Sequence, residues 1–234
     1  MNDKVQFAGH FLPFHRLYVV EYEEALRNFC NYTGPASPYW NWTIDAANIE
    51  GSNMFTDSSP SGLRGRGDPN NDYSLYPGDG GFSNFYHYYP SPHVIRRNFT
   101  LYPFATEGKD SQVDRLINSH IGDFKSFQAE AEVFQSAHTA GHQMMGGDMG
   151  RYIPFGYYLV VLTRANRFVD ALFWLHHSMV DKVWWEWQNA HPANAWAFEG
   201  GATVMLENAT IYAKYPNGGA PFMDLNTRIP DDNM

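Results

Sequence analysis

The sequence predicts a mainly α-helical fold interrupted by long irregular loops. In three stretches, about residues 14–29, 122–145 and 168–189, apolar residues recur every three or four positions, as they do on one face of a helix. Between residues 31 and 102 the chain is instead rich in glycine, proline, serine, asparagine and aspartate, which favours irregular structure. We also expect a shorter helix near residues 111–120.

The composition excludes several classes of protein. The 234 residues carry 16 basic and 25 acidic side chains, a net charge of −9, and the basic residues do not cluster. Such a chain is a poor ligand for nucleic acid, because it offers the phosphates no basic surface. Cys30 is the single cysteine, so no disulfide forms within the chain. The sequence has neither a secretory signal nor an apolar run of about 18 residues, so we expect a cytoplasmic protein without a membrane span.

The second helical stretch carries a pair of histidines. His138 and His142 are four residues apart, so on a helix both side chains project from the same face. Two imidazoles at this spacing can share one metal ion. Gly146 and Gly147 follow the pair and are expected to end the helix.

The third helical stretch supplies a further histidine. Its apolar stripe passes through His177, which we expect to join the same ion, whereas His176 lies beside the stripe and is better suited to donate a hydrogen bond. Asp181, one turn later, is expected to accept the outer N–H of a histidine ligand. Phe173, one turn earlier, is expected to shield the ion. The alternative is that these are core histidines satisfied by backbone carbonyls.

The same segments resemble a known family. Two segments resemble the second copper half-site of the tyrosinase and hemocyanin family. They are the pattern from His138 to Met149, and the run Phe-Trp-Leu-His-His at residues 173–177 with Val180-Asp181-Lys182 after it. This resemblance implies a tyrosinase-like helical bundle and the metal ligands His138, His142 and His177. Residues 11–16 resemble the box that carries the last histidine of the first half-site, and residues 38–42 resemble the segment that follows it.

The resemblance also predicts the domain organisation of the chain. We expect a single domain over residues 1–234, with its parts in this order: a remnant of the first half-site at 5–45, an irregular loop region at 46–110, metal-binding helices at 120–190 and C-terminal loops at 191–234.

The first half-site departs from the family pattern. The family has a histidine five residues before the phenylalanine of the box, where this sequence has Gln6, and a further histidine on an upstream helix, whereas only ten residues precede Phe11. Thr139 and Ala171 replace an asparagine and a proline of the second half-site. We therefore expect one metal ion per chain, Zn²⁺ rather than copper, because a lone copper has no partner ion with which to share the electrons of O₂ reduction.

The resemblance extends to the short tyrosinase-like cyclopenases of fungal quinolone-alkaloid pathways. It implies a non-oxidative zinc enzyme of lyase or isomerase type that contracts a cyclopenin-type benzodiazepinedione epoxide to a viridicatin-type quinolone. The substrate is then a small aromatic alkaloid, with His15 and Gln6 as the residues that contact it opposite the ion. The alternatives are a truncated or partner-completed copper phenol or catechol oxidase, and a non-catalytic, hemocyanin-like metal-binding protein. A homodimer is expected if a second chain covers the apolar faces near the site.

Overall fold

The computed structural model describes residues 5–88, 92–133, 135–150, 170–202 and 222–229. The chain divides into two compact units, which are described separately: unit 1 is Met1–Tyr39, Val113–Val133 and His177–Met234, and unit 2 is Trp40–Gln112 and Phe134–His176. The expectation of a single domain stays a prediction.

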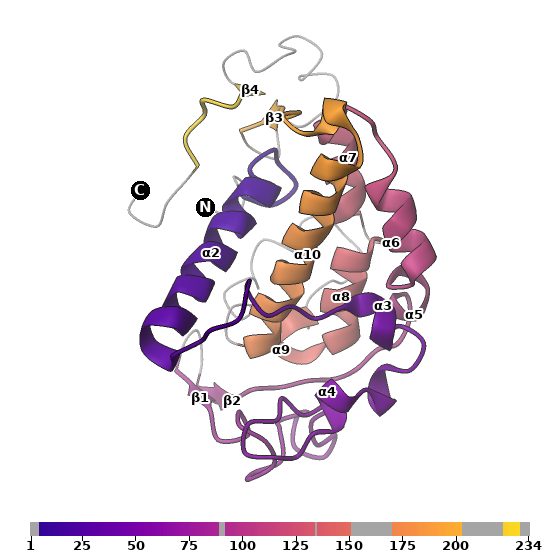
Figure 1. Cartoon of the computed structure of the whole chain (residues 1–234). Coiled ribbons are helices and arrows are strands. Elements are labelled where there is room, and N and C mark those ends of the chain that lie inside the picture. The colour runs from indigo at the N-terminus through magenta and orange to yellow at the C-terminus, as the bar shows by residue number, and fades with distance from the viewer. Residues whose placement is uncertain (1–4, 89–91, 134, 151–169, 203–221, 230–234) are drawn as a thin grey trace. The chain divides into compact units, whose positions relative to one another are not determined.

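The described elements are mostly helices (Figure 1). Unit 1 contains α2 (Phe11–Cys30), α7 (Phe124–Glu132), η3 (Pro192–Asn194), β3 (Gly200–Gly201) and β4 (Phe222–Met223). Unit 2 contains α3 (Trp42–Asp45), η1 (Ile49–Gly51), α4 (Asn53–Thr56), β1 (Tyr86–His87), β2 (His93–Val94), α5 (Phe104–Glu107), α8 (Ala137–Met145) and α9 (Gly147–Gly150). Helices α6 (Asp110–Ile117) and α10 (Ala171–Ala190) run from one unit into the other.

The strands are short and pair in twos. Strands β1 and β2 pair antiparallel with His87 opposite His93, and β3 and β4 pair antiparallel with Gly200 opposite Met223. The predicted mainly α fold is therefore confirmed for the described residues. None of the described helices combines the length and apolar character of a membrane span.

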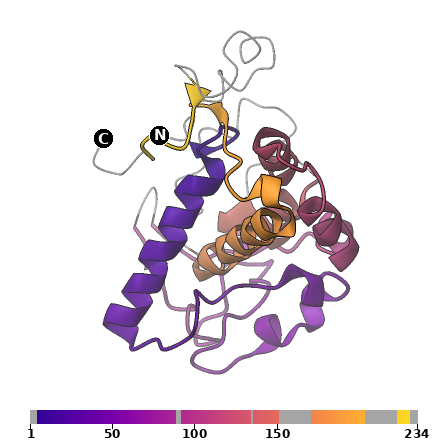
Figure 2. The ribbon, with the colours of Figure 1, turned by 45° about the horizontal axis from the view of Figure 1, so that its top comes forward.

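Helix α2 matches the first predicted stripe only in its N-terminal half. Phe11, Phe14, His15 and Val19 are buried, but Phe29, the last residue of the predicted stretch, is 84% exposed. The start of the helix is tied to β3, because the Gly9 amide donates to the Gly201 carbonyl at 3.0 Å. Its C-terminal end lies away from that strand in both views (Figures 1 and 2), and residues 27–30 of its last turn are all exposed.

The second predicted helix is two helices, α7 and α8, and the expectation of one continuous helix was wrong. Val133 and Ser136 both have extended backbone angles, with ψ near 159°. The Ser136 hydroxyl accepts the Thr139 amide at 3.1 Å, and such a serine cap starts a new helix. Phe134, within the second predicted helix, lies outside the described residues.

Helix α10 confirms the third predicted stripe. Phe173, His177, Val180, Trp184 and Trp187 are all buried. The predicted start at residue 168 lies outside the described residues, and within them Asp170 caps the helix by accepting the Leu172 amide at 3.0 Å.

A buried ion pair joins the irregular region of unit 2 to α10. Both guanidinium nitrogens of Arg97 that face Asp170 donate to its carboxylate, at 2.7 and 2.8 Å, and both side chains have 0% exposure. Arg97 also donates to the Leu63 and Arg64 carbonyls. These contacts fix loops that have little regular structure of their own.

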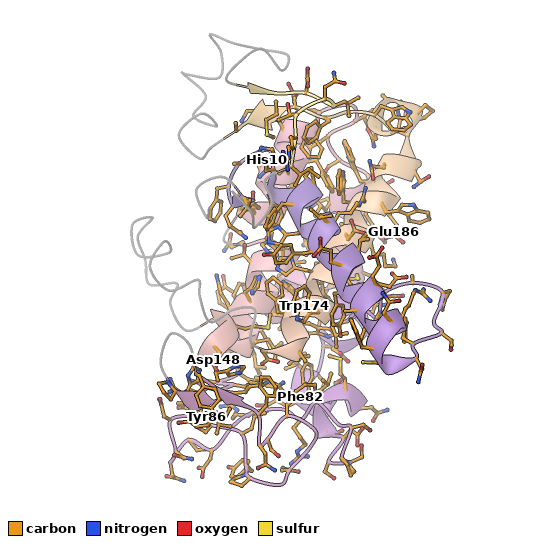
Figure 3. All side chains as sticks on the ribbon, turned by 90° about the vertical axis from the view of Figure 1, so that its left-hand side faces the viewer. His10, Phe82, Tyr86, Asp148, Trp174 and Glu186 are labelled. Atoms are coloured by element: carbon orange, nitrogen blue, oxygen red, sulfur yellow. The ribbon has the colours of Figure 1, made fainter. Side chains whose placement is uncertain are left out.

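The β1–β2 pair is also tied to α9. His93 Nε2 lies 3.1 Å from Asp148 Oδ1, and the Arg96 amide donates to Asp148 Oδ2 at 2.9 Å. Figure 3 shows Asp148 at the same end of unit 2 as Tyr86 of β1. Burial raises the pKa of the Asp148 carboxyl, and the Arg96 amide and His93 oppose that rise.

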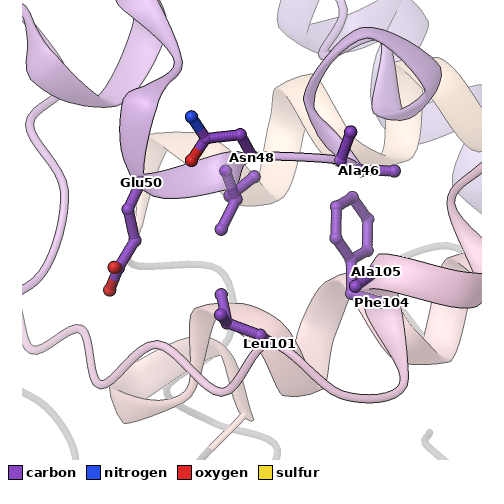
Figure 4. A pocket seen from close by; sticks show the side chains of 8 residues that line it. Ala46, Asn48, Glu50, Leu101, Phe104 and Ala105 are labelled. Atoms are coloured by element: carbon purple, nitrogen blue, oxygen red, sulfur yellow. The ribbon is translucent and has the colours of Figure 1, made fainter.

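A pocket of unit 2 lies between residues 46–50 and 101–105 (Figure 4). Its lining is mainly apolar, with Asn48 and Glu50 as the polar side chains. It contains none of the predicted site residues, so we do not assign it a part in their chemistry.

Candidate metal centre

Helix α8 brings His138 and His142 together as predicted. The two side chains are 7% and 2% exposed, and their ring centroids are 4.9 Å apart. The Ser136 cap sets where the helix begins, and Gly146, with a positive φ of 53°, ends it. The ring of Phe173 lies 6.2 Å from that of His142, and its role in shielding the ion stays a prediction.

Helix α10 completes a group of four histidines. The possible ligand atoms of His138, His142, His176 and His177 all lie within 4.8 Å of one another, and all four side chains are buried. The boundary between the units falls between His176 and His177, so the continuous helix itself carries His177 into the group. A compact, buried set of imidazoles suits Zn²⁺ or copper, so the residues fit a metal ion of the kind the sequence predicts.

The membership of His176 was not predicted. The Trp42 indole donates to His176 Nδ1 at 3.0 Å, and the His176 ring lies against α8 at Gly141. A Cβ atom on residue 141 would lie 2.4 Å from His176 Cε1, so only glycine leaves room for the ring. The glycine between the two histidines of α8 was the available sequence signal.

His15 and Gln6 lie together in unit 1. The His15 ring stacks on the His177 ring, with centroids 4.4 Å apart and planes inclined by 15°. Gln6 Nε2 is 3.0 Å from His15 Nε2, and His15 Nδ1 is 2.7 Å from the Phe11 carbonyl oxygen. The structure therefore places His15 beside His177 and Gln6 beside His15, and their contact with a substrate stays a prediction.

Glu132 is a residue of this region that the sequence did not reveal. Its carboxylate is 2% exposed and accepts the Phe7 amide at 2.7 Å, where Phe7 has a positive φ of 51°. It also accepts the Gln128 side-chain amide. Glu132 thereby holds the turn next to Gln6, from a position more than a hundred residues later in the sequence.

Asp181 does not take the role that was expected. Its described hydrogen bond goes to Arg16 rather than to a histidine, because a guanidinium is a charged donor within reach. Arg16 in turn lies over the Trp184 ring, 3.7 Å from its centroid. Burial raises the pKa of the Asp181 carboxyl, and the charge of Arg16 opposes part of that rise. This pair joins α2 to α10 within unit 1.

Comparison with known proteins supports the resemblance that the motifs indicate. The family model described as the common central domain of tyrosinase matches residues 4–190. The chain belongs to the tyrosinase family. The buried four-histidine group lies within this match and is consistent with one half of a tyrosinase-family metal site.

The similar proteins are fungal. Tyrosinase ustQ of Aspergillus flavus is 31% identical over 199 residues, which cover 79% of this chain and 50% of ustQ. Oxidase hkm6 of Aspergillus hancockii is 30% identical over 243 residues, covering 86% of this chain and 80% of hkm6. The chain thus spans about half the length of some curated relatives and most of another.

A solved structure supports the fold. A polyphenol oxidase variant from Thermothelomyces thermophila matches with a TM-score of 0.62 and 21% sequence identity, covering 92% of this chain and 61% of that one. At this identity the likeness shows the fold alone, and it confirms the tyrosinase-like architecture.

Proposed function

We propose that this tyrosinase-family protein is a mononuclear zinc enzyme of fungal secondary metabolism. It is proposed to catalyse a non-oxidative rearrangement of the cyclopenase type, with His138, His142 and His177 as the ligands of one ion per chain. The substrate class is a small aromatic alkaloid that carries an epoxide or carbonyl oxygen. The observation that supports this proposal most directly is the state of His15.

Both ring nitrogens of His15 already have hydrogen-bond partners. A carbonyl oxygen only accepts, so His15 Nδ1 donates its proton to Phe11. His15 Nε2 then carries the lone pair and accepts from the Gln6 amide. Gln6, where the family has a histidine, gives this nitrogen a hydrogen bond and offers no imidazole of its own to a second copper ion, which supports a single ion per chain.

The metal ion and the side chains of the protein have different proposed tasks in the reaction. A bound Zn²⁺ would supply Lewis-acid stabilisation of negative charge that develops on a substrate oxygen. His15 and Gln6 form a hydrogen-bonding pair beside His177, and a polar group of the substrate can replace either partner. His15 is the group proposed to take up and return a proton in this reaction.

The proposed reaction balances without an oxidant. A cyclopenin-type epoxide loses methyl isocyanate, and the remaining atoms form the contracted quinolone ring of the viridicatin type. Neither O₂ nor an external electron acceptor is consumed. We therefore expect turnover of a cyclopenin-type substrate to be the same in air and under strictly air-free conditions. Turnover that stops when O₂ is removed would contradict the proposed chemistry.

Replacing His15 by alanine is expected to slow this reaction about 100-fold or more while the protein keeps its ion. The reason is that His15 is proposed to move a proton but not to bind the metal. The measurement is kcat on a cyclopenin-type substrate together with the metal content of the same sample.

His191 provides the matched control for His15. It is exposed in the turn at η3, where its ring accepts the Ala193 amide, so His191→Ala is expected to change neither quantity. Loss of the ion in His15→Ala would show that His15 is a ligand, and an unchanged kcat would remove it from the reaction.

A copper-dependent phenol or catechol oxidase is the second candidate, favoured by the names of the relatives. The relative ustQ is named a tyrosinase, and hkm6 is named an oxidase. In this case histidines from a partner or from a longer chain would have to complete a second copper site. Copper-dependent darkening of catechol by this chain alone would favour this candidate over the zinc enzyme.

The remaining expectations stay predictions. They are the homodimer, the cytoplasmic location, and the third alternative of a non-catalytic metal-binding protein. The last would require a fourth protein ligand that closes the site, and His176 is placed where such a ligand would be.

A further inference from the structure

The hydrogen bond between Trp42 and His176 decides what the fourth histidine of the group can do. The two side chains are 2% and 0% exposed, and the indole Nε1 lies 3.0 Å from His176 Nδ1. Both residues belong to unit 2, as do His138 and His142. The contact is therefore part of the packing of one compact unit.

The direction of this hydrogen bond fixes the tautomer of His176. An indole N–H only donates, so His176 Nδ1 must be the acceptor and carries no proton. The ring of His176 then carries its proton on Nε2. A metal ion needs a nitrogen lone pair, but that of Nδ1 accepts the indole proton and Nε2 is protonated.

The ring of His176 has little room to turn into another arrangement. On one side it meets the backbone of α8 at Gly141, where even a Cβ atom would be too close. The His138 ring stacks on it at 5.5 Å with an inclination of 16°, and the His142 ring meets it edge-on at 4.5 Å. The packing thus preserves the contact with Trp42.

We propose that Trp42 is a positioning residue that sets the number of histidine ligands at the metal centre. It holds His176 in the Nε2–H tautomer and so keeps it from binding the ion. Three histidines then hold the ion and one coordination position stays available to a substrate. This inference rests on the proposed metal site, but it does not depend on which reaction the site catalyses.

The test compares Trp42→Phe with Trp40→Phe. Trp40 is the matched control because its ring also lies beside His176, at 5.9 Å, whereas its indole donates to Asp45 at 2.8 Å. Zinc-loaded samples are examined by X-ray absorption, which counts imidazole ligands, and zinc affinity is measured by competition with a chelator.

We expect three imidazole ligands in the unsubstituted protein and in Trp40→Phe, and four in Trp42→Phe. With a fourth ligand, zinc affinity should rise in Trp42→Phe alone. If Trp42 instead only held a metal-binding histidine in place, Trp42→Phe should lower zinc affinity, by about 10- to 100-fold. Three ligands together with weaker binding in Trp42→Phe would therefore overturn the proposal.

A second measurement needs no substitution of Trp42 and covers the case in which that variant does not fold. Nitrogen-15 NMR of the zinc-loaded protein distinguishes the two imidazole tautomers, and the His176 signals are those that disappear in His176→Gln. We expect a protonated Nε2 and an unprotonated Nδ1. A proton on Nδ1, or a zinc-bound His176, would contradict the proposal. The NMR measurement uses no substrate. Its result therefore tests the role of Trp42 separately from the proposed cyclopenase activity.

Discussion

Replacing His177 by alanine is expected to remove the bound metal, from about one ion per chain to close to none. His177 is buried in the four-histidine group, and its loss leaves two of the three proposed ligands. Two imidazoles are too few for a stable tetrahedral site, because the remaining positions would be filled only by weakly held ligands. Elemental analysis after gel filtration measures the effect directly, and His138→Ala is expected to give the same result.

The control for this loss is again a histidine outside the group. His191→Ala is expected to retain about one ion per chain, because its ring is exposed and belongs to the turn at η3. If His177→Ala retained its metal while remaining folded, His177 would not be a ligand. The four-histidine group would then have to hold the ion through the other three members.

Replacing Asp170 by alanine is expected to destabilise the protein by about 3–5 kcal/mol. The substitution leaves the Arg97 guanidinium buried without its carboxylate, and it also removes the cap of α10. Urea unfolding followed by circular dichroism, on metal-free and zinc-loaded samples, measures the change in the free energy of unfolding. The metal-free sample separates this effect from any change in metal binding.

An exposed ion pair of the same unit provides the comparison for Asp170. The side chains of Arg66 and Glu50 are 44% and 53% exposed, so Glu50→Ala is expected to cost only about 0–1 kcal/mol. A loss below about 1 kcal/mol in Asp170→Ala as well would show that the loops are held by other contacts than Arg97.

Helical periodicity was sufficient to predict the elements that carry the three proposed ligands. The spacing of His138 and His142 places both on one face of α8, and the stripe of α10 buries His177 together with its apolar neighbours. Periodicity did not reveal the break between α7 and α8, because the apolar pattern continues across it. Ser136 was the local signal for the break, since serine is a preferred residue at the start of a helix.

The contacts that the sequence did not predict join distant parts of the chain. Trp42 meets His176 across 134 residues, and Arg97 meets Asp170 across 73. Asp181 was assigned to a histidine because only its helical neighbours could be considered, whereas Arg16 approaches from another helix. Such pairings follow from tertiary packing, and a single sequence carries no spacing rule for them.

We propose that this tyrosinase-family chain holds one catalytic zinc ion and not a pair of coppers. The most direct test is the metal content of protein purified without added metal, measured per chain by inductively coupled plasma mass spectrometry. We predict about one zinc ion per chain and no stoichiometric copper. Two copper ions per chain would contradict the claim and would favour the oxidase.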